Sequence, residues 1–482
     1  MIVNTQNFMT GPNNCTPTLS PYGKYVIDVN KTDFAPRIGI AWDPFKTGKT
    51  SIRMGYGIYH EQVLNGTFLQ NIGTNPPYQV NATASNTSLD NPAANAAVAI
   101  SLASQGLRAV QTNWHTPYMQ HWSLDWQQQL TSKTVITVGY YGSKGTHLQG
   151  LTEMNSLKEG VALSSQCAPG NNFFGQAAAF TSVTCQPAQY AFRNSATTAV
   201  QGNPNVVGTT LFTDVLILDQ LRPYRGYRSI AMVQPRYDSN YHSLQFSAEH
   251  RFSDFSQVVA FYTWSKNLTT SPNDRTTSPQ NAYDIRSEYQ LAAFDRRHIF
   301  SLNYVYELPF FQDQKGFVGK LLGGWQAAGI VTYNSGLPFT VTTSSYDAAG
   351  LGIVNTNPAA RPNLLCDPNE GGAQTAQQWF NTACFSTNIP LVTGAFTPVP
   401  NVIGNTARGN VEGPPTSRVD ITLVKNFRFG ENVRVVFRAE AFNVFNHTNF
   451  RALSTNVTAT NFGAVTTVRD PRTMQFGTKV SF

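Results

Sequence analysis

The sequence has few charged residues and no long hydrophobic run. Asp, Glu, Lys and Arg make up 13% of its 482 residues, whereas soluble domains carry roughly 25%. No stretch of about 18 consecutive apolar residues occurs, which excludes a helical membrane protein. Mean hydropathy is −0.26, although hydrophobic residues reach 41% and aromatic residues 12%. This combination favours strands in which apolar residues alternate with uncharged polar residues.

Sequence motifs for enzyme chemistry are also missing. Residues 47–50 end like a phosphate-binding loop, but Asp43 stands where the first glycine of that motif belongs. Residues 142–145 lack the spacing of a nucleophile elbow, and His60-Glu61 lacks the second histidine of a zinc protease. We therefore expect no enzyme activity, no catalytic residue, no bound metal and no cofactor.

Sequence features of nucleic-acid binding and of a signal peptide are also absent. The formal net charge of +7 is spread along the chain without a Lys/Arg run, so nucleic acid is not expected as a partner. Neither a basic segment nor an apolar segment of a signal peptide follows Met1. We interpret this as either no export or a missing amino-terminal part.

Five cysteines are present. Cys167 and Cys185 are 18 residues apart, as are Cys366 and Cys384, and Cys15 is left over. Two local pairs inside long polar loops predict loop disulfides in an oxidising compartment, although spacing alone leaves free thiols open. Metal binding is disfavoured because no CxxC motif or nearby histidine accompanies them.

Apolar and polar residues alternate at the end of the chain. One face of residues 473–482 carries Met474, Phe476, Thr478, Val480 and Phe482, and the other carries Gln475, Gly477, Lys479 and Ser481. This period of two predicts a strand with one apolar and one polar face. A soluble protein avoids an open edge at its end, whereas a membrane barrel can close on itself there.

The same alternation recurs along the chain and predicts about eleven strands of roughly 7–13 residues, a length that crosses a bilayer when tilted. They cover residues 37–42, 51–58, 121–127, 136–140, 243–249, 258–264, 297–308, 325–333, 418–423, 434–441 and 473–482. No repeat of 40–50 residues is present and the gaps are very unequal, which disfavours a propeller or a soluble sandwich. Aromatic residues gather near strand ends, as at a membrane interface.

Short and long connections alternate strictly. Those near 44–49, 131–133, 253–255, 309–321 and 428–432 are short, and the others are long and rich in Asn, Thr, Pro and Gly. Outer-membrane barrels have short periplasmic turns and long extracellular loops. This predicts that residues 1–36 are an extracellular loop remnant and that 37–482 are the carboxyl-terminal part of a longer barrel.

Charged residues near the end of the chain fall on the polar face of two predicted strands: Arg418, Asp420, Arg434, Arg438 and Glu440. Catalysis by these residues is possible only in principle. We interpret them as a charge network that faces the lumen and neutralises itself.

Several stretches resemble the Oar-like branch of the TonB-dependent outer-membrane transporters. They are residues 33–44, 51–59, 294–300, 323–326, 335–338 and 437–446, in this order. The end resembles the barrel assembly signal of that family through Gln475, Gly477, Val480 and Phe482. The resemblance implies a 22-stranded barrel, a carboxypeptidase-regulatory-like module, a plug and energy supplied through TonB. None of the module, the plug or the TonB box is found in this sequence.

The predicted fold is therefore all-β: an antiparallel transmembrane sheet forming the carboxyl-terminal half of a 22-stranded barrel. A smaller closed pore, in which the strand at Arg37 pairs with the strand at Thr473, is the alternative. We expect binding and uptake of an unidentified large nutrient across the outer membrane of a Gram-negative bacterium, or else a surface structural or adhesion role. The expected partners are outer-membrane lipid, the barrel assembly machinery and, only through the missing part, the TonB complex.

Overall fold

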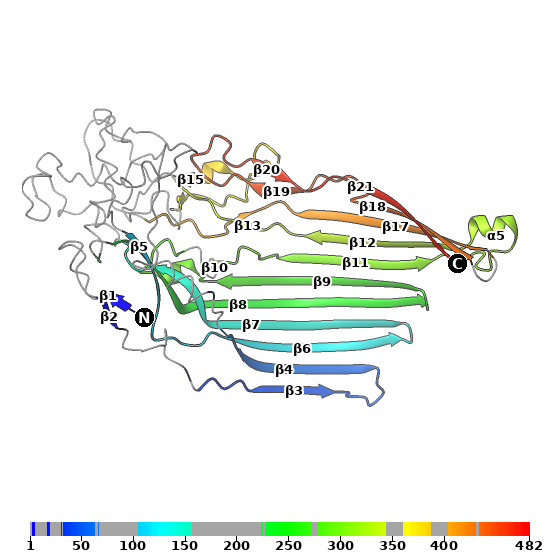
Figure 1. Ribbon diagram of the computed structural model, residues 1–482, viewed down its shortest axis with the longest axis horizontal. Coiled ribbons are helices and arrows are strands. Elements are labelled where there is room, and N and C mark those ends of the chain that lie inside the picture. The colour runs from blue at the N-terminus through cyan, green and yellow to red at the C-terminus, as the bar shows by residue number, and fades with distance from the viewer. Residues whose placement is uncertain are drawn as a thin grey trace, which may run out of the picture.

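One large antiparallel sheet dominates the molecule (Figure 1). The structure is a computed structural model that describes residues 2–4, 17–19, 30, 32–62, 66, 105–156, 223–224, 227–271, 278–343, 360–386, 403–429 and 433–482. The strands of the sheet follow the path β21-β18-β17-β12-β11-β9-β8-β7-β6-β4-β3. Two of its 13 strands, β5 and β10, lie off this path, which leaves the eleven that the alternation predicts.

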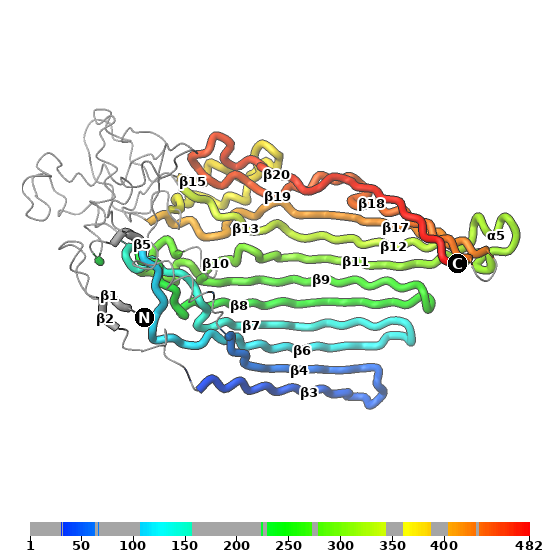
Figure 2. Tube along the Cα trace, viewed as in Figure 1, coloured from blue at the N-terminus to red at the C-terminus, as the bar shows by residue number. Residues whose placement is uncertain are grey.

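The strands of the path are β3 (Arg37–Trp42), β4 (Thr50–His60), β6 (Tyr118–Thr131), β7 (Thr134–Glu153), β8 (Tyr227–Ser253), β9 (Ser256–Thr269), β11 (His298–Glu307), β12 (Trp325–Asn334), β17 (Thr416–Phe429), β18 (Val433–Phe442) and β21 (Thr473–Ser481). Every neighbouring pair along the path is antiparallel. The connections at the right-hand end of Figure 2 are short, and we call this end the short-turn rim.

Strand register brings the apolar residues of successive strands onto one common face. One row across six strands consists of Ile40, Met54, Leu124, Tyr140, Leu244 and Trp264, each directly opposite the next. Their side chains are 40–52% exposed, so no second protein layer covers them in the part of the chain that is described. A broad exposed apolar face is unstable in water and suits contact with lipid.

Some strands are longer than predicted. The expectation of roughly 7–13 residues is wrong for β7 and β8, which have 20 and 27 residues. About 9–11 residues suffice to cross a bilayer, so these strands continue beyond the part of the sheet that crosses the membrane. There β8 gains a parallel partner, β5 (Gln105–Val110). The connection predicted near 144–239 is correspondingly shorter, because β7 ends at Glu153 and β8 begins at Tyr227.

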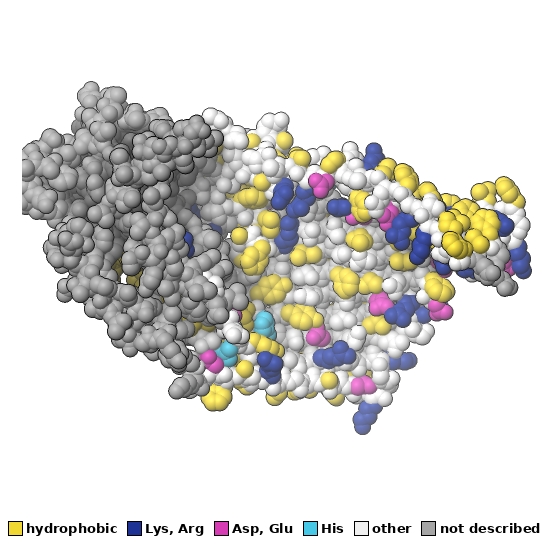
Figure 3. Space-filling model, in the orientation of Figure 1, with side chains coloured by type: hydrophobic (Ala, Val, Ile, Leu, Met, Phe, Trp, Pro, Cys, Tyr) yellow, Lys and Arg dark blue, Asp and Glu magenta, His cyan; other side chains and the backbone are white. Residues whose placement is uncertain are grey.

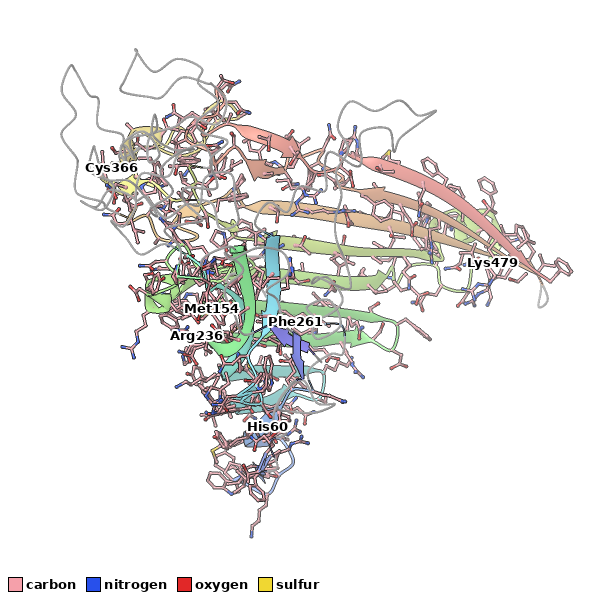
Figure 4. The ribbon with its side chains drawn as sticks, turned by 60° about the vertical axis from the view of Figure 1, so that its left-hand side comes forward. His60, Met154, Arg236, Phe261, Cys366 and Lys479 are labelled. Carbon is pink, nitrogen blue, oxygen red and sulfur yellow. A yellow bond between two sulfur atoms is a disulfide. The ribbon has the colours of Figure 1, made fainter. Side chains whose placement is uncertain are left out.

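The sheet is open. The two end strands, β3 and β21, each have one neighbour among the described residues, β4 and β18 respectively. His60 on β4 and Lys479 on β21 lie at far-apart corners of the view in Figure 4. The alternative of a small pore closed by pairing of β3 with β21 is therefore wrong.

A small apolar core lies at the rim opposite the short turns. It consists of Val341, Phe380, Val411 and Leu453, which are 0–7% exposed. Short ladders surround it: β13 (Pro338–Phe339) with β16 (Val411–Glu412), β14 (Asn363–Leu364) with β15 (Phe385–Ser386), and β19 (Phe450–Leu453) with β20 (Val465–Val468). The described part of this rim therefore has an apolar core of its own.

Two segments predicted as a loop and a short turn contain regular structure. Residues 1–36 include a ladder between β1 (Ile2–Asn4) and β2 (Pro17–Leu19). The connection between β11 and β12 contains the helix α5 (Gly316–Leu322). No helix in the described ranges combines the length and the apolarity that membrane spanning requires.

Candidate functional site

The five charged residues predicted to face the lumen lie on the polar face of the sheet, at β17 and β18. Arg418 Nε lies 2.7 Å from Asp420 Oδ1, and Arg438 Nη1 lies 3.4 Å from Glu440 Oε1. Arg434 instead donates from Nη2 to the side-chain oxygen of Asn426 (2.8 Å). The charges are thus joined as pairs along each strand, and Arg434 is matched by an amide. Charged side chains are scattered over the face of the sheet seen in Figure 3.

The polar face is hollowed near the β3 edge of the sheet. The hollow has a volume of about 580 Å³, and its lining comes from β3, β4, β6, β7 and β8. Three of its lining residues are glycines on the facing strands β3 and β4: Gly39, Gly55 and Gly57. Since glycine has no side chain to fill the space above the sheet, these positions make its floor low.

Aromatic side chains stand around this floor. Tyr59 lies over Gly57, where an added Cβ would be 2.9 Å from the tyrosine ring. The Arg37 guanidinium lies 4.4 Å from the centre of the same ring, and His121 meets it edge-on at 5.2 Å between centroids. Tyr141 also lines the hollow. The site therefore offers aromatic surface with a guanidinium and an imidazole at hand, which suits non-covalent binding.

The sequence contained a signal for this hollow that the strand pattern alone does not interpret. The polar faces of residues 37–42 and 51–58 carry glycine where other strands carry serine, glutamine or threonine. Glycine weakens a strand. Its repetition therefore indicates that another group approaches the backbone of these strands closely. Which aromatic side chains would surround it depends on the register between β4 and β6, and the sequence does not supply that register.

A buried ion pair joins three segments of the rim opposite the short turns. Arg361 donates two hydrogen bonds of 2.9 Å to the carboxylate of Glu288, which ends the 3-10 helix η6 (Ile285–Glu288) and is 1% exposed. Arg408 donates to the backbone oxygens of Thr269 (2.5 Å) and Glu288 (2.9 Å). Burial alone would raise the pKa of the Glu288 carboxyl, but the hydrogen bonds and charge of Arg361, the backbone N–H of Gln280 and the charge of Arg408 hold that pKa below its ordinary value.

The predicted assembly residues lie on and just after the edge strand β21. Gln475 is opposite Glu440 and Gly477 is opposite Arg438 on the polar face, while Val480 is opposite Val435 on the apolar face. Phe482 follows the strand and is 99% exposed. These residues therefore share an accessible edge, and a role in assembly remains a prediction.

Cysteines of the two predicted pairs differ in what the structure describes. Cys366 and Cys384 form a disulfide with 4.9 Å between their Cα atoms, and the second belongs to the 3-10 helix η7 (Thr382–Cys384). Cys15, Cys167 and Cys185 lie outside the described residues. In the described ranges, no group of three or more His, Cys, Asp and Glu side chains could hold a metal ion.

An open sheet with an exposed apolar belt on one face and a polar, hollowed opposite face defines a membrane-embedded β-barrel protein. The sequence matches the family described as "Outer membrane beta barrel domain" over residues 3–475. The chain belongs to this family and is a protein of the outer membrane. The predicted fold class and location are confirmed, and the matched family is a barrel domain rather than an enzyme family.

Solved structures with a similar fold include three bacterial proteins. The outer membrane transporter YddB from Escherichia coli aligns at 11% identity, with a TM-score of 0.46, 93% of this chain covered and 40% of that chain covered. The FrpB iron transporter from Neisseria meningitidis aligns at 8% identity, with a TM-score of 0.37, 92% and 38% covered. The ferripyoverdine receptor of the outer membrane of Pseudomonas aeruginosa aligns at 9% identity, with a TM-score of 0.36, 93% and 33% covered.

This chain spans at most 40% of the length of these three proteins. A comparison with curated proteins gave no match. The family assignment rests on the sequence match, which covers nearly the whole chain.

Proposed function

We propose that the chain is the carboxyl-terminal barrel part of a TonB-dependent receptor that binds and takes up a nutrient across the outer membrane. The observation that carries this proposal is the open eleven-strand path with edges at β3 and β21. Unpaired strand edges are not tolerated in hydrocarbon, because each unsatisfied backbone group costs several kcal/mol. Further strands that pair with both edges would complete a barrel, and an equal number would give 22.

Strand number bears on transport because it sets the width of the lumen. A barrel of 22 strands encloses a wide lumen that a plug can fill, whereas an eleven-strand barrel has little room. The polar face of this sheet would line that lumen, with the hollow beside Arg37 and Tyr59 within it. Aromatic rings and a guanidinium there fit the role of binding a large solute on its way through.

Orientation follows from the lengths of the connections. We infer that the short-turn rim faces the periplasm, because outer-membrane barrels have short turns on that side. Residues 1–36 and the long connections would then lie outside the cell, and residues 37–482 would form the barrel part. The Oar-like branch, the TonB complex as partner through an amino-terminal segment, and the barrel assembly machinery belong to the same proposal.

The deciding experiment is to sequence the gene immediately upstream of the codon for Met1 and, if a plug and TonB box are encoded in frame, to delete that box. We expect a plug and a TonB box, and loss of growth on the scarce nutrient when the box is removed. An unrelated upstream gene, with unchanged growth after deletion of this chain but lost attachment to surfaces, would favour the structural or adhesion role instead.

A further inference from the structure

The connection between β11 and β12, residues 308–324, is built around α5 and carries an exposed apolar surface. The side chains that are 49–82% exposed are Phe310, Phe311, Phe317, Val318, Leu321 and Leu322. Hydrophobic side chains gather over α5 at the right-hand end of Figure 3. Six large apolar side chains in so short a segment exceed what scattered surface hydrophobics account for.

This connection is fixed to the sheet rather than loosely attached. Where β12 begins, β17 continues past it, and the side chain of Gln314 takes the place of a strand partner. Its Nε2 donates to the backbone oxygen of Asn426 (2.9 Å), and its Oε1 accepts from the backbone N–H of Arg428 (3.0 Å). Gln314 is 5% exposed and adopts a positive φ of 49°. A non-glycine residue held in this region indicates that the surrounding contacts determine the backbone.

Lys425 places α5 on the apolar side of the sheet. Lys425 lies in β17 directly opposite Trp325 and Phe437, among the residues of the apolar face, and is 2% exposed. Its ammonium donates to the backbone oxygens of Leu321 (3.1 Å) and Gly323. The indole N–H of Trp325 donates to the same Leu321 oxygen (3.0 Å). Both donors belong to the apolar face, so the end of α5 lies over that face.

A strand added to an edge of the sheet would not cover the apolar surface around α5. The strands β11 and β12 that flank α5 lie inside the path, with β17, β18 and β21 between them and the nearer edge. A strand added at β21 would therefore not reach α5. The end of α5 adjoins the apolar face of the sheet at the short-turn rim, because Trp325 and Lys425 of that face donate to the Leu321 oxygen.

Positive charge predominates on the surface around α5. Lys315 and Lys320 belong to the same connection, and the Lys315 side chain is 87% exposed. Asp313 is the acidic residue there, 3.7 Å from Lys315. Apolar residues flanked by lysines at the edge of a membrane belt are typical of segments that lie in the headgroup region and favour anionic lipids.

We propose that residues 308–324 form a lipid-interface anchor: α5 and its flanking phenylalanines insert among phospholipids of the leaflet at the short-turn rim, and Lys315 and Lys320 contact anionic headgroups. The choice of phospholipid rests on the periplasmic orientation proposed above, and the lipid contact itself does not depend on transport. Lys425 and Gln314 are the residues that hold the anchor in position.

Quenching by brominated phospholipid tests the contact. The protein encoded by the whole gene, carrying Phe317→Trp, is folded with vesicles of phosphatidylethanolamine and phosphatidylglycerol with or without bromine on their acyl chains. The emission of the added tryptophan is taken as the difference from the parent protein. We expect this emission to be lower with bromine than without it, because an aromatic side chain at the interface lies at the level of the headgroups. Leu365→Trp, at an exposed position of the opposite rim, is the matched control and should keep its emission.

A second pair of variants keeps the test decisive. Val318→Trp probes an adjacent exposed position should Phe317→Trp fail to fold, and Lys315→Glu with Lys320→Glu tests the charge. Combined with Phe317→Trp, the double charge variant should lose the extra quenching that vesicles containing phosphatidylglycerol give over vesicles in which phosphatidylcholine, which has no net charge, replaces it. Emission from both tryptophan probes as unquenched as that from the control would overturn the anchor. Equal quenching in vesicles with and without phosphatidylglycerol would overturn the preference for anionic lipid.

Discussion

The side-chain amide of Gln475 donates a hydrogen bond to the carboxylate of Glu440 across the ladder between β21 and β18. Glu440 also pairs with Arg438 on its own strand. A residue of the predicted assembly signal is therefore tied to one of the charge pairs on the polar face. The contact helps to hold the last strand in register, because a one-residue shift would carry Gln475 to the apolar face.

Replacing Gln475 by Leu should weaken the attachment of β21. We expect a loss of about 1 kcal/mol in the free energy of unfolding, since one hydrogen bond to a partly solvated carboxylate is removed. Urea unfolding of the protein encoded by the whole gene, inserted in phospholipid vesicles, would measure it; the same protein serves in the other vesicle experiments, because open strand edges are not tolerated in hydrocarbon. Lys479→Met on the same face of the same strand is the control and should change stability less. Equal effects of the two variants would contradict a specific role for the amide.

Removal of Phe482 should block membrane insertion while leaving the packing of this sheet unchanged. Phe482 is 99% exposed, so its deletion removes almost no intramolecular contact. Heat-modifiable migration on a gel reports whether the barrel has inserted. Phe482→Tyr, which keeps an aromatic end, should insert as the parent does. Normal heat-modifiable migration of the deletion variant would refute a role for Phe482 in assembly.

Thiol counting distinguishes the cysteine pairings. Of five cysteines, two form the Cys366–Cys384 disulfide; if Cys167 and Cys185 are bridged as well, one free thiol remains. We expect one cysteine to react with a maleimide in denaturant without reductant, and all five after reduction. Three reactive thiols before reduction would eliminate the second bridge. Removing Cys366 and Cys384 together should cost about 3 kcal/mol, from the loop that the bridge closes.

Acid should loosen the rim at Glu288. Because its folded-state pKa is lowered, the carboxylate stabilises the fold at neutral pH, and this contribution is lost as the pH falls below about 4.3 and through the folded value. Glu288→Gln should cost about 3–5 kcal/mol at pH 7, since Arg361 and Arg408 stay charged and buried. Hydrogen exchange of the rim segments would detect both changes. Glu370→Gln, at an exposed position, is the control.

Two neighbouring residues of β8 test which face meets lipid. Leu244→Arg puts a charge in the apolar row and should destabilise the inserted protein by about 2–4 kcal/mol. Gln245→Arg puts the same charge on the polar face and should change stability by less than about 1 kcal/mol. Urea unfolding from vesicles compares the two variants. If Gln245→Arg were the more destabilising variant, the face that carries Gln245 would be the one that meets lipid.

Much of this architecture was determined by the sequence itself. A period of two in residues such as Ile38, Ile40 and Trp42 makes one face apolar whatever the strand pairs with, because successive side chains point to opposite sides. The number of strands on the path and their antiparallel order follow from that period and from the short turns. The separation of Cys366 and Cys384 likewise indicated their pairing.

Only the tertiary structure decided how strands and loops meet. Whether β3 pairs with β21 depends on the twist and curvature of the whole sheet, which local alternation does not encode. The hollow beside Arg37 needs the register of β4 against β6 to bring Tyr59 and His121 together. The contact of Glu288 with Arg361 joins residues 73 positions apart. The position of α5 depends on Lys425 of β17, which donates to the end of the helix, and on Gln314, which reaches from the connection of α5 to β17. Such contacts depend on distances through space, and residue periodicity carries no information about them.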